Sequence, residues 1–124
     1  MAASPVNPAS ELKLETEKKN SETIVRATGR ITLDTSAALE KTLRDPIAKG
    51  MRVVLDLTNV DYIDSAGLGA LVSVYMHARR TNCDLKIANP KQRIKDLFTR
   101  SGLASVFESR SFDVLWEAWS RGGS

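Results

Sequence analysis

The sequence contains very little cysteine and histidine. Cys83 and His77 are the only residues of their types among the 124. A single cysteine cannot form a disulfide within the chain, and neither residue has companions at the spacing of a metal site. We therefore expect no metal, no cofactor and no disulfide framework. A lone cysteine of this kind also favours a reducing compartment.

Long apolar runs are missing as well. No segment approaches the roughly 18 apolar residues that a membrane-spanning helix requires. The opening stretch MAASPVNPAS lacks the basic start and the apolar centre of a secretion signal. The sequence therefore predicts a cytoplasmic protein that does not insert into a membrane.

Charge of one sign is not concentrated along the chain. The net charge is +3, but the lysines and arginines are scattered, and the short cluster KQRIK at 91–95 is typical of a solvated helix face. No basic patch is interleaved with aromatic residues, as binders of single-stranded nucleic acid require. We expect no direct nucleic-acid partner.

The length and the alternation of apolar patterns indicate one domain. Residues 1–10 predict a disordered tail, residues 11–120 a single folded domain, and residues 121–124 a frayed end. The polar turn EKKNSE should join the first two strands into a hairpin, and Gly29 should end the second one. The expected strands are 12–17, 23–28, 53–57, 84–88 and 106–107.

Helical periodicity lies between and after these strands. Asp34, Thr35 and Ser36 offer N-caps for the first helix, which Gly50 should end. Pro46 should kink the last turn of that helix or restart it as a separate turn. The apolar stripes of the four expected helices fall at 39–47, 68–76, 94–98 and 114–119.

Strands that alternate with helices predict an α/β fold. We expect a single domain with a mixed, mainly parallel sheet of four to five strands, flanked by about four helices. In such sheets, binding sites collect in the loops that follow the carboxyl ends of the strands. Residues 29–34 and Ser65 lie in two of these loops.

Ser65 stands in the stretch VDYIDSAGLGALV, residues 60–72, where a catalytic role is the first possibility. A serine nucleophile needs a base within hydrogen-bond reach. His77 lies twelve residues further along the same expected helix, a distance of about 18 Å. The glycine that precedes the serine by two residues in a nucleophile elbow is also absent. A lysine base stays open, but no residue points to one, and we expect the protein not to be an enzyme.

A cap at the start of a helix is the second possibility. Asp64 or Ser65 can accept a bond from the first backbone amides, worth about 1 kcal/mol, while a tight turn at Ala66 leaves the serine hydroxyl exposed. Gly67 and Gly69, however, each cost the helix up to about 1 kcal/mol relative to alanine. Small residues at this cost suggest that another surface approaches closely.

The motifs around Ser65 resemble a known family. The run LDLTNVDYIDSAGLGALV, residues 55–72, resembles the signature of the STAS domain, the family of anti-sigma factor antagonists. Upstream, GRITLD at 29–34 resembles the family's Gly-x-x-x-Leu-Asp loop. Downstream, the likeness continues through LKIANPKQRIKDLFTRSGL at 85–103. It covers about residues 12–118 and implies a mixed sheet flanked by helices, in agreement with the pattern of the elements.

The resemblance implies a switch protein with Ser65 as the phosphoacceptor. Family members are phosphorylated on the serine of Asp-Ser-x-Gly by a partner anti-sigma factor that is also a serine kinase, and a serine phosphatase reverses this. Unphosphorylated members bind that partner and free its sigma factor. The partner-facing surface implied for this chain comprises Gly29, Leu33, Asp34, Asp64, Ser65, Gly67, Leu68 and Gly69.

Two other functions stay open. Some relatives lack regulation by phosphorylation, and a module of the same fold can be an accessory subunit of a transporter or of a larger signalling assembly. A serine-dependent enzyme is the other alternative.

A phosphate on Ser65 is expected to change the surface rather than the fold. It would add about −1.5 to −2 charges and three acceptor oxygens. The amides and the dipole at a helix N-terminus favour such a group, whereas Asp64 repels it. A loss of about 3 kcal/mol on docking would suffice for an on/off response. We expect a steric and electrostatic switch without refolding.

Overall fold

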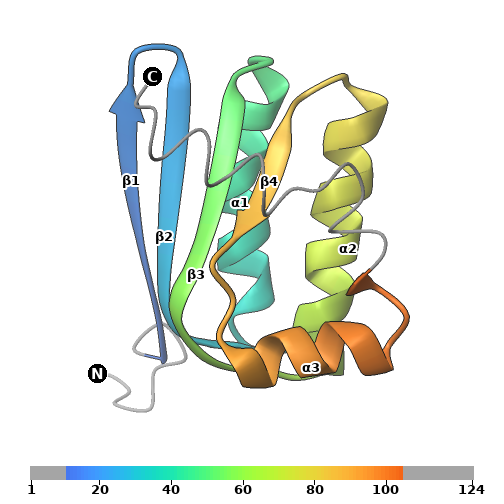
Figure 1. Cartoon of the computed structure of the whole chain (residues 1–124). Helices are drawn as coiled ribbons and strands as arrows, with labels where there is room; N and C mark the ends of the chain where they lie inside the picture. Colours follow the sequence, from blue (N-terminus) through green and yellow to red (C-terminus); the bar gives the residue numbers. More distant parts are fainter. Residues whose placement is uncertain (1–10, 105–124) are drawn as a thin grey trace.

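The computed structural model describes residues 11–104, which form four strands and three helices in the expected order (Figure 1). The expected tail at 1–10, the strand at 106–107, the helix at 114–119 and the end at 121–124 lie outside the described residues. The elements are β1 (Leu12–Lys19), β2 (Glu22–Ile31), α1 (Ser36–Ala48), β3 (Arg52–Ile63), α2 (Ser65–Arg80), β4 (Leu85–Ala88) and α3 (Gln92–Arg100).

The four strands form one mixed sheet in the order β1-β2-β3-β4. β1 and β2 are an antiparallel hairpin, whereas β2 pairs with β3, and β3 with β4, in parallel. The expected α/β class is therefore confirmed. Because β2, β3 and β4 run in one direction, their carboxyl ends meet at one edge of the sheet, the lower edge in Figure 1, where α3 also lies.

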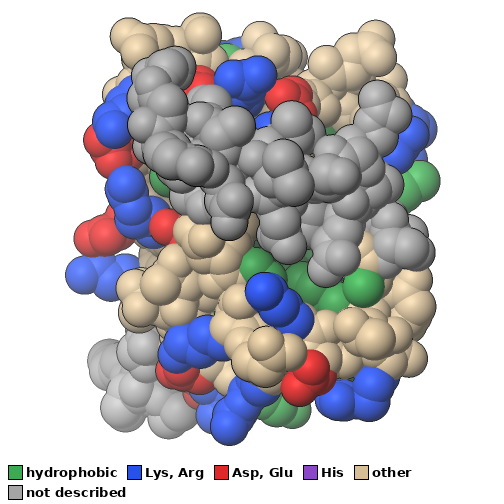
Figure 2. Space-filling model, in the orientation of Figure 1, with side chains coloured by type: hydrophobic (Ala, Val, Ile, Leu, Met, Phe, Trp, Pro, Cys, Tyr) green, Lys and Arg blue, Asp and Glu red, His purple; other side chains and the backbone are tan. Residues whose placement is uncertain are grey.

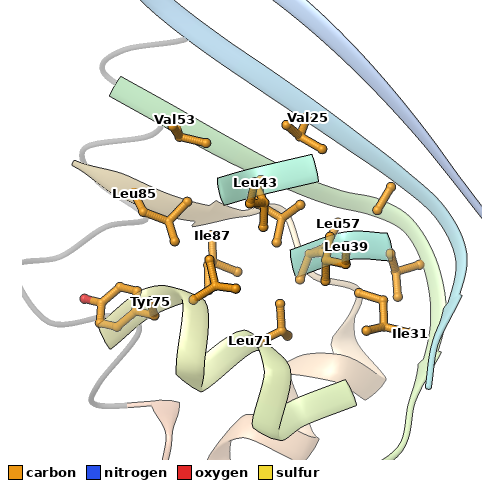
Figure 3. Close-up of a cluster of buried hydrophobic side chains, with 14 of the residues drawn as sticks. Val25, Ile31, Leu39, Leu43, Val53, Leu57, Leu71, Tyr75, Leu85 and Ile87 are labelled. Carbon is orange, nitrogen blue, oxygen red and sulfur yellow. The ribbon is translucent and has the colours of Figure 1, made fainter. Parts of the chain in front are cut away.

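The core lies between one face of the sheet and helices α1 and α2. Strand pairing places Val25, Leu55 and Ile87 in one row across β2, β3 and β4, and all three side chains are buried. Figure 3 shows Leu43 of α1 and Leu71 of α2 pointing into the same space. Burial of one such side chain contributes about 1.5–3 kcal/mol. This packing fixes both helices, and hence the start of α2, against the sheet.

β3 is longer than the expected strand at 53–57 because its pairing with β2 is irregular. The partners of Arg26 and Thr28 are Asp56 and Asn59, and the partners of Gly29 and Arg30 are Val60 and Tyr62. At each of these two places β3 carries one residue more than β2, as in a β-bulge. The buried residues after Leu55 therefore follow at spacings of two, three and three: Leu57, Val60 and Ile63. This spacing hides the period of two by which a strand is recognised in a sequence.

Gly29 does not end the second strand, contrary to the expectation. β2 continues to Ile31 and pairs Gly29 with Leu12 on one side and Val60 on the other. Gly29 has a φ of +119°, and the carbonyl oxygen of Glu11 lies 2.0 Å from the position that a Cβ would take. Only glycine fits this backbone, so its function is to let β2 pass an irregular position inside the sheet.

Pro46 does not restart α1 as a separate turn. The helix runs to Ala48, and the amides of Lys49 and Gly50 then donate to the carbonyls of Asp45 and Ile47. Because Pro46 lies in the last turn, its missing amide removes only one helical hydrogen bond. Gly50 ends the helix as expected, with a φ of +70°.

Replacing Gly29 by alanine should destabilise the fold far more than the same change at Gly50. Both residues have a positive φ, but only Gly29 would set a Cβ against backbone atoms. We expect Gly29→Ala to lower the free energy of unfolding by about 3 kcal/mol or more, and Gly50→Ala by about 1 kcal/mol. Urea denaturation of both variants measures the difference. Equal losses would show that the approach of Glu11 to Gly29 is not a constraint.

Candidate functional site

Ser65 is the first residue of α2, and its side chain is exposed at the carboxyl edge of the sheet. Within residues 11–104 its hydroxyl has no hydrogen-bond partner. The N-cap of α2 is Asp64, whose carboxylate accepts a hydrogen bond from the amide of Gly67 (2.8 Å). The capping function therefore belongs to Asp64, and the Ser65 hydroxyl is left accessible to another molecule.

Asp64 also holds the loop that follows β2. Its Oδ2 atom accepts a hydrogen bond from the amide of Leu33 (3.2 Å), and its own amide donates to the carbonyl of Ile31 (3.2 Å). One carboxylate therefore binds two backbone amides that belong to different segments. A sequence does not reveal this bond, because Leu33 and Asp64 are 31 residues apart. It fixes the position of Leu33 relative to Ser65.

Thr35 is a second residue that shapes this loop, and the sequence offered it only as a helix cap. Its hydroxyl accepts a hydrogen bond from the amide of Thr32 (2.8 Å) and donates to the carbonyl of Arg30 (2.9 Å). Thr35 is buried and occupies the N-cap position of α1, but its side chain makes no capping bond there. The loop is thus closed from within by Thr35 and held to α2 by Asp64.

The two glycines of the motif have different surroundings. A Cβ on Gly67 would lie 2.1 Å from the carbonyl oxygen of Ile31, so glycine is needed for α2 to start against the end of β2. Gly67 is buried, so it packs against the end of β2 and does not form part of the accessible surface. Gly69 is exposed, and apart from the adjacent backbone of its own helix no atom of the described chain lies within 4 Å of its Cβ position. Internal packing gives no reason for a glycine at position 69.

The structure gathers only part of the predicted surface around Ser65. Leu33 and Asp34 are exposed in the loop next to α2, and Leu68 is half-buried in its first turn. Gly29 is not in this loop, because it lies inside β2 against β1. Leu33, Asp34 and Gly69 are therefore the predicted residues that are exposed beside Ser65.

Exposed apolar side chains also concentrate at this edge. Leu33 is 72% exposed and Tyr62 is 44% exposed, and within residues 11–104 the other large apolar side chain of this kind is Met76. The guanidinium of Arg30 lies 4.7 Å from the centre of the Tyr62 ring, a cation–π contact. Leu33 and Tyr62 therefore leave apolar surface in water on the same edge of the sheet as the Ser65 hydroxyl.

His77 is not placed to act as a base for Ser65. His77 is on α2, twelve residues and about 18 Å along the helix from Ser65. Within residues 11–104 no group of three or more His, Cys, Asp and Glu could hold a metal ion. The same part of the chain has no helix long and apolar enough to span a bilayer.

Comparison with known proteins gives a family for this arrangement. The model of the STAS domain matches residues 13–118. BtrV of Bordetella bronchiseptica, a candidate anti-sigma factor antagonist, is 33% identical over 97 residues, which are 77% of this chain and 84% of BtrV. The anti-sigma-B factor antagonist of Bacillus subtilis is 24% identical over 97 residues, which are 78% of this chain and 89% of that protein.

Two solved structures of the protein SpoIIAA share the fold of this chain. The anti-sigma factor antagonist SpoIIAA in its unphosphorylated form has a TM-score of 0.63 at 16% identity, over 74% of this chain and 83% of SpoIIAA. SpoIIAA of Bacillus in the phosphorylated form has a TM-score of 0.58 at 17% identity, over 74% of this chain and 84% of SpoIIAA. At these identities the likeness shows the fold alone.

Removing the Asp64 carboxylate should loosen the site and destabilise the protein. Asp64→Ala leaves the amides of Gly67 and Leu33 without their acceptor, and we expect a loss of about 1–2 kcal/mol in the free energy of unfolding. Amide hydrogen exchange should quicken at Leu33 and Gly67. The control is Asp34→Ala, an exposed carboxylate in the same loop, with an expected change within about 0.5 kcal/mol. Unchanged exchange at Leu33 in Asp64→Ala would contradict the bridging function of Asp64.

Proposed function

The chain belongs to the STAS domain family, and we propose that it is an anti-sigma factor antagonist that is switched off by phosphorylation of Ser65. The observation that carries this proposal is the exposed Ser65 hydroxyl, next to exposed apolar surface at Leu33. A kinase can reach this hydroxyl without unfolding the domain. A partner that covers Leu33 must also cover Ser65.

The proposed partner is an anti-sigma factor that is also a serine kinase. In its unphosphorylated state the protein binds this partner and thereby frees the sigma factor, and a serine phosphatase restores the binding state. The protein itself is not an enzyme and does not bind nucleic acid directly. Its place of action is the cytoplasm, since sigma factors act on the transcription machinery there.

Electrostatics supports a switch of this kind. A phosphate on Ser65 would stand beside the Asp64 carboxylate and would carry about −1.5 to −2 charges. Docking would have to remove water from this dianion together with the apolar surface of Leu33, and burial of an unpaired charge is costly. The two solved forms of SpoIIAA both share the fold of this chain, which supports a switch that leaves the fold in place.

Incubation with Mg-ATP and each serine-kinase anti-sigma factor of the same organism, followed by mass spectrometry, tests the proposal. We expect one kinase to add a phosphate to Ser65, and Ser65→Ala to abolish the modification. Ser73→Ala, which changes another exposed serine on α2, is the control and should be phosphorylated normally. The phosphorylated protein should bind that kinase about 100-fold more weakly, equivalent to about 3 kcal/mol. Phosphate elsewhere, or equal binding by both forms, would refute the switch.

Gly69→Ala should separate stability from partner binding. The Cβ position of Gly69 is empty in the described part of the chain, so alanine should stabilise α2 by up to about 1 kcal/mol. If the partner approaches Gly69 closely, the added methyl group should weaken binding about tenfold while the free energy of unfolding rises. Calorimetric titration and urea denaturation measure the two effects. Undiminished affinity in Gly69→Ala would remove Gly69 from the partner-facing surface.

A further inference from the structure

A groove lies between the end of β3 and α3, beside the proposed docking surface. Its volume is about 370 Å³, and it is lined by the apolar residues Tyr62, Ile63, Ile94 and Leu97 and by the charged residues Arg93, Asp96 and Arg100. We name it the β3–α3 groove. We propose that it receives an acidic segment of the anti-sigma factor while the same partner covers Ser65. This inference rests on the proposed function and extends the contact surface beyond the residues that the Ser65 motif indicates.

The floor of the groove is apolar and preformed. Ile63 and Ile94 are buried and belong to the core, so the floor of the groove is part of the packed domain. Tyr62 and Leu97 rise from this floor and remain partly accessible. A docked segment can therefore place an apolar side chain on Tyr62 and Leu97 without rearranging the domain. Such a preformed site lowers the cost of ordering on binding.

Two arginines give the rim a positive charge. Arg93 and Arg100 are both exposed, and as residues seven apart on α3 they lie on one face of the helix, about two turns from each other. Within residues 11–104 neither forms an ion pair, whereas the acidic residue of the groove, Asp96, accepts a hydrogen bond from Gln92 (2.9 Å). Figure 2 shows Lys and Arg side chains around α3 at the lower end of the molecule. Two guanidinium groups on one helix face, beside an apolar floor, are suited to bind carboxylates of a partner.

Contacts between α3 and the ends of β2 and β3 place the groove next to the Ser65 site. Lys91, just before α3, is ion-paired with Asp61 of β3, which ties the helix to the strand that leads to Ser65. The hydrogen bond from Lys91 lowers the pKa of Asp61, and the charge of Arg93 adds to this effect. Tyr62 lines the groove on one side, and Arg30, from the end of β2, covers its ring. A partner seated over Ser65 is therefore adjacent to the groove.

The charge-reversal pair Arg93→Glu/Arg100→Glu tests this inference. The probe is the kinase anti-sigma factor that phosphorylates Ser65 in the experiment above, with affinity measured by titration at low and at physiological salt. We expect affinity to fall about tenfold or more, with a smaller salt dependence than the wild type shows. The matched control, Arg79→Glu/Arg80→Glu, makes the same charge change at the far end of α2 and should bind within about twofold.

The outcomes distinguish the two proposals. If the kinase phosphorylates Ser65 but the groove variant and the control bind equally well, or lose affinity equally, the groove proposal is wrong and the proposed function stands. If no anti-sigma factor of the organism binds the wild type, both proposals fall. Circular dichroism checks the fold, and Arg93→Gln/Arg100→Gln replaces the charge reversal should that variant fail to fold. A loss of affinity in Arg93→Glu/Arg100→Glu, without a loss in Arg79→Glu/Arg80→Glu, supports the inference.

Discussion

The Asp64 carboxylate is the interaction on which the arrangement of the site depends. It accepts one hydrogen bond from the start of α2, at Gly67, and one from the loop after β2, at Leu33. Because the carboxylate oxygens of Asp64 accept these backbone hydrogen bonds, Asp64 caps α2 and the Ser65 hydroxyl is not needed as a cap. The hydroxyl of Ser65 is thus available to another protein, and the exposed Leu33 is held at a fixed position beside it.

The irregular sheet brings these groups together. Each of the two extra residues in β3 shifts its pairing with β2, so that Ile31 and Ile63 end the strands side by side. Asp64 then follows directly and its amide reaches the carbonyl of Ile31. Bulges commonly lie next to functional sites because they redirect a strand and its side chains. Gly29 and Gly67 complete this edge, since each occupies a place where backbone atoms leave no room for a Cβ.

The sequence predicted what depends on local pattern and failed where distant segments meet. The fold class, the accessible hydroxyl of Ser65 and Asp64 as a possible cap followed from periodicity and capping preferences. The extent of β3 did not, because two bulges removed its period of two. The bond from Leu33 to Asp64 joins segments that only the folded sheet brings together. Arg93 was correctly assigned to a solvated helix face, since it is exposed on α3, but the groove beside it depends on how α3 lies against Tyr62.

The same geometry explains why a phosphate on Ser65 would act on a partner more than on its own helix. Four amides at a helix start lack partners within the helix. In α2 two of them are already used, since the amides of Asp64 and Gly67 donate to the Ile31 carbonyl and the Asp64 carboxylate. Within the part of the chain that the structure describes, the amides of Ser65 and Ala66 would be left for the phosphate, and the Asp64 charge beside it is repulsive. A dianion that the protein neutralises so incompletely keeps its hydration, and any partner must remove that hydration in order to dock.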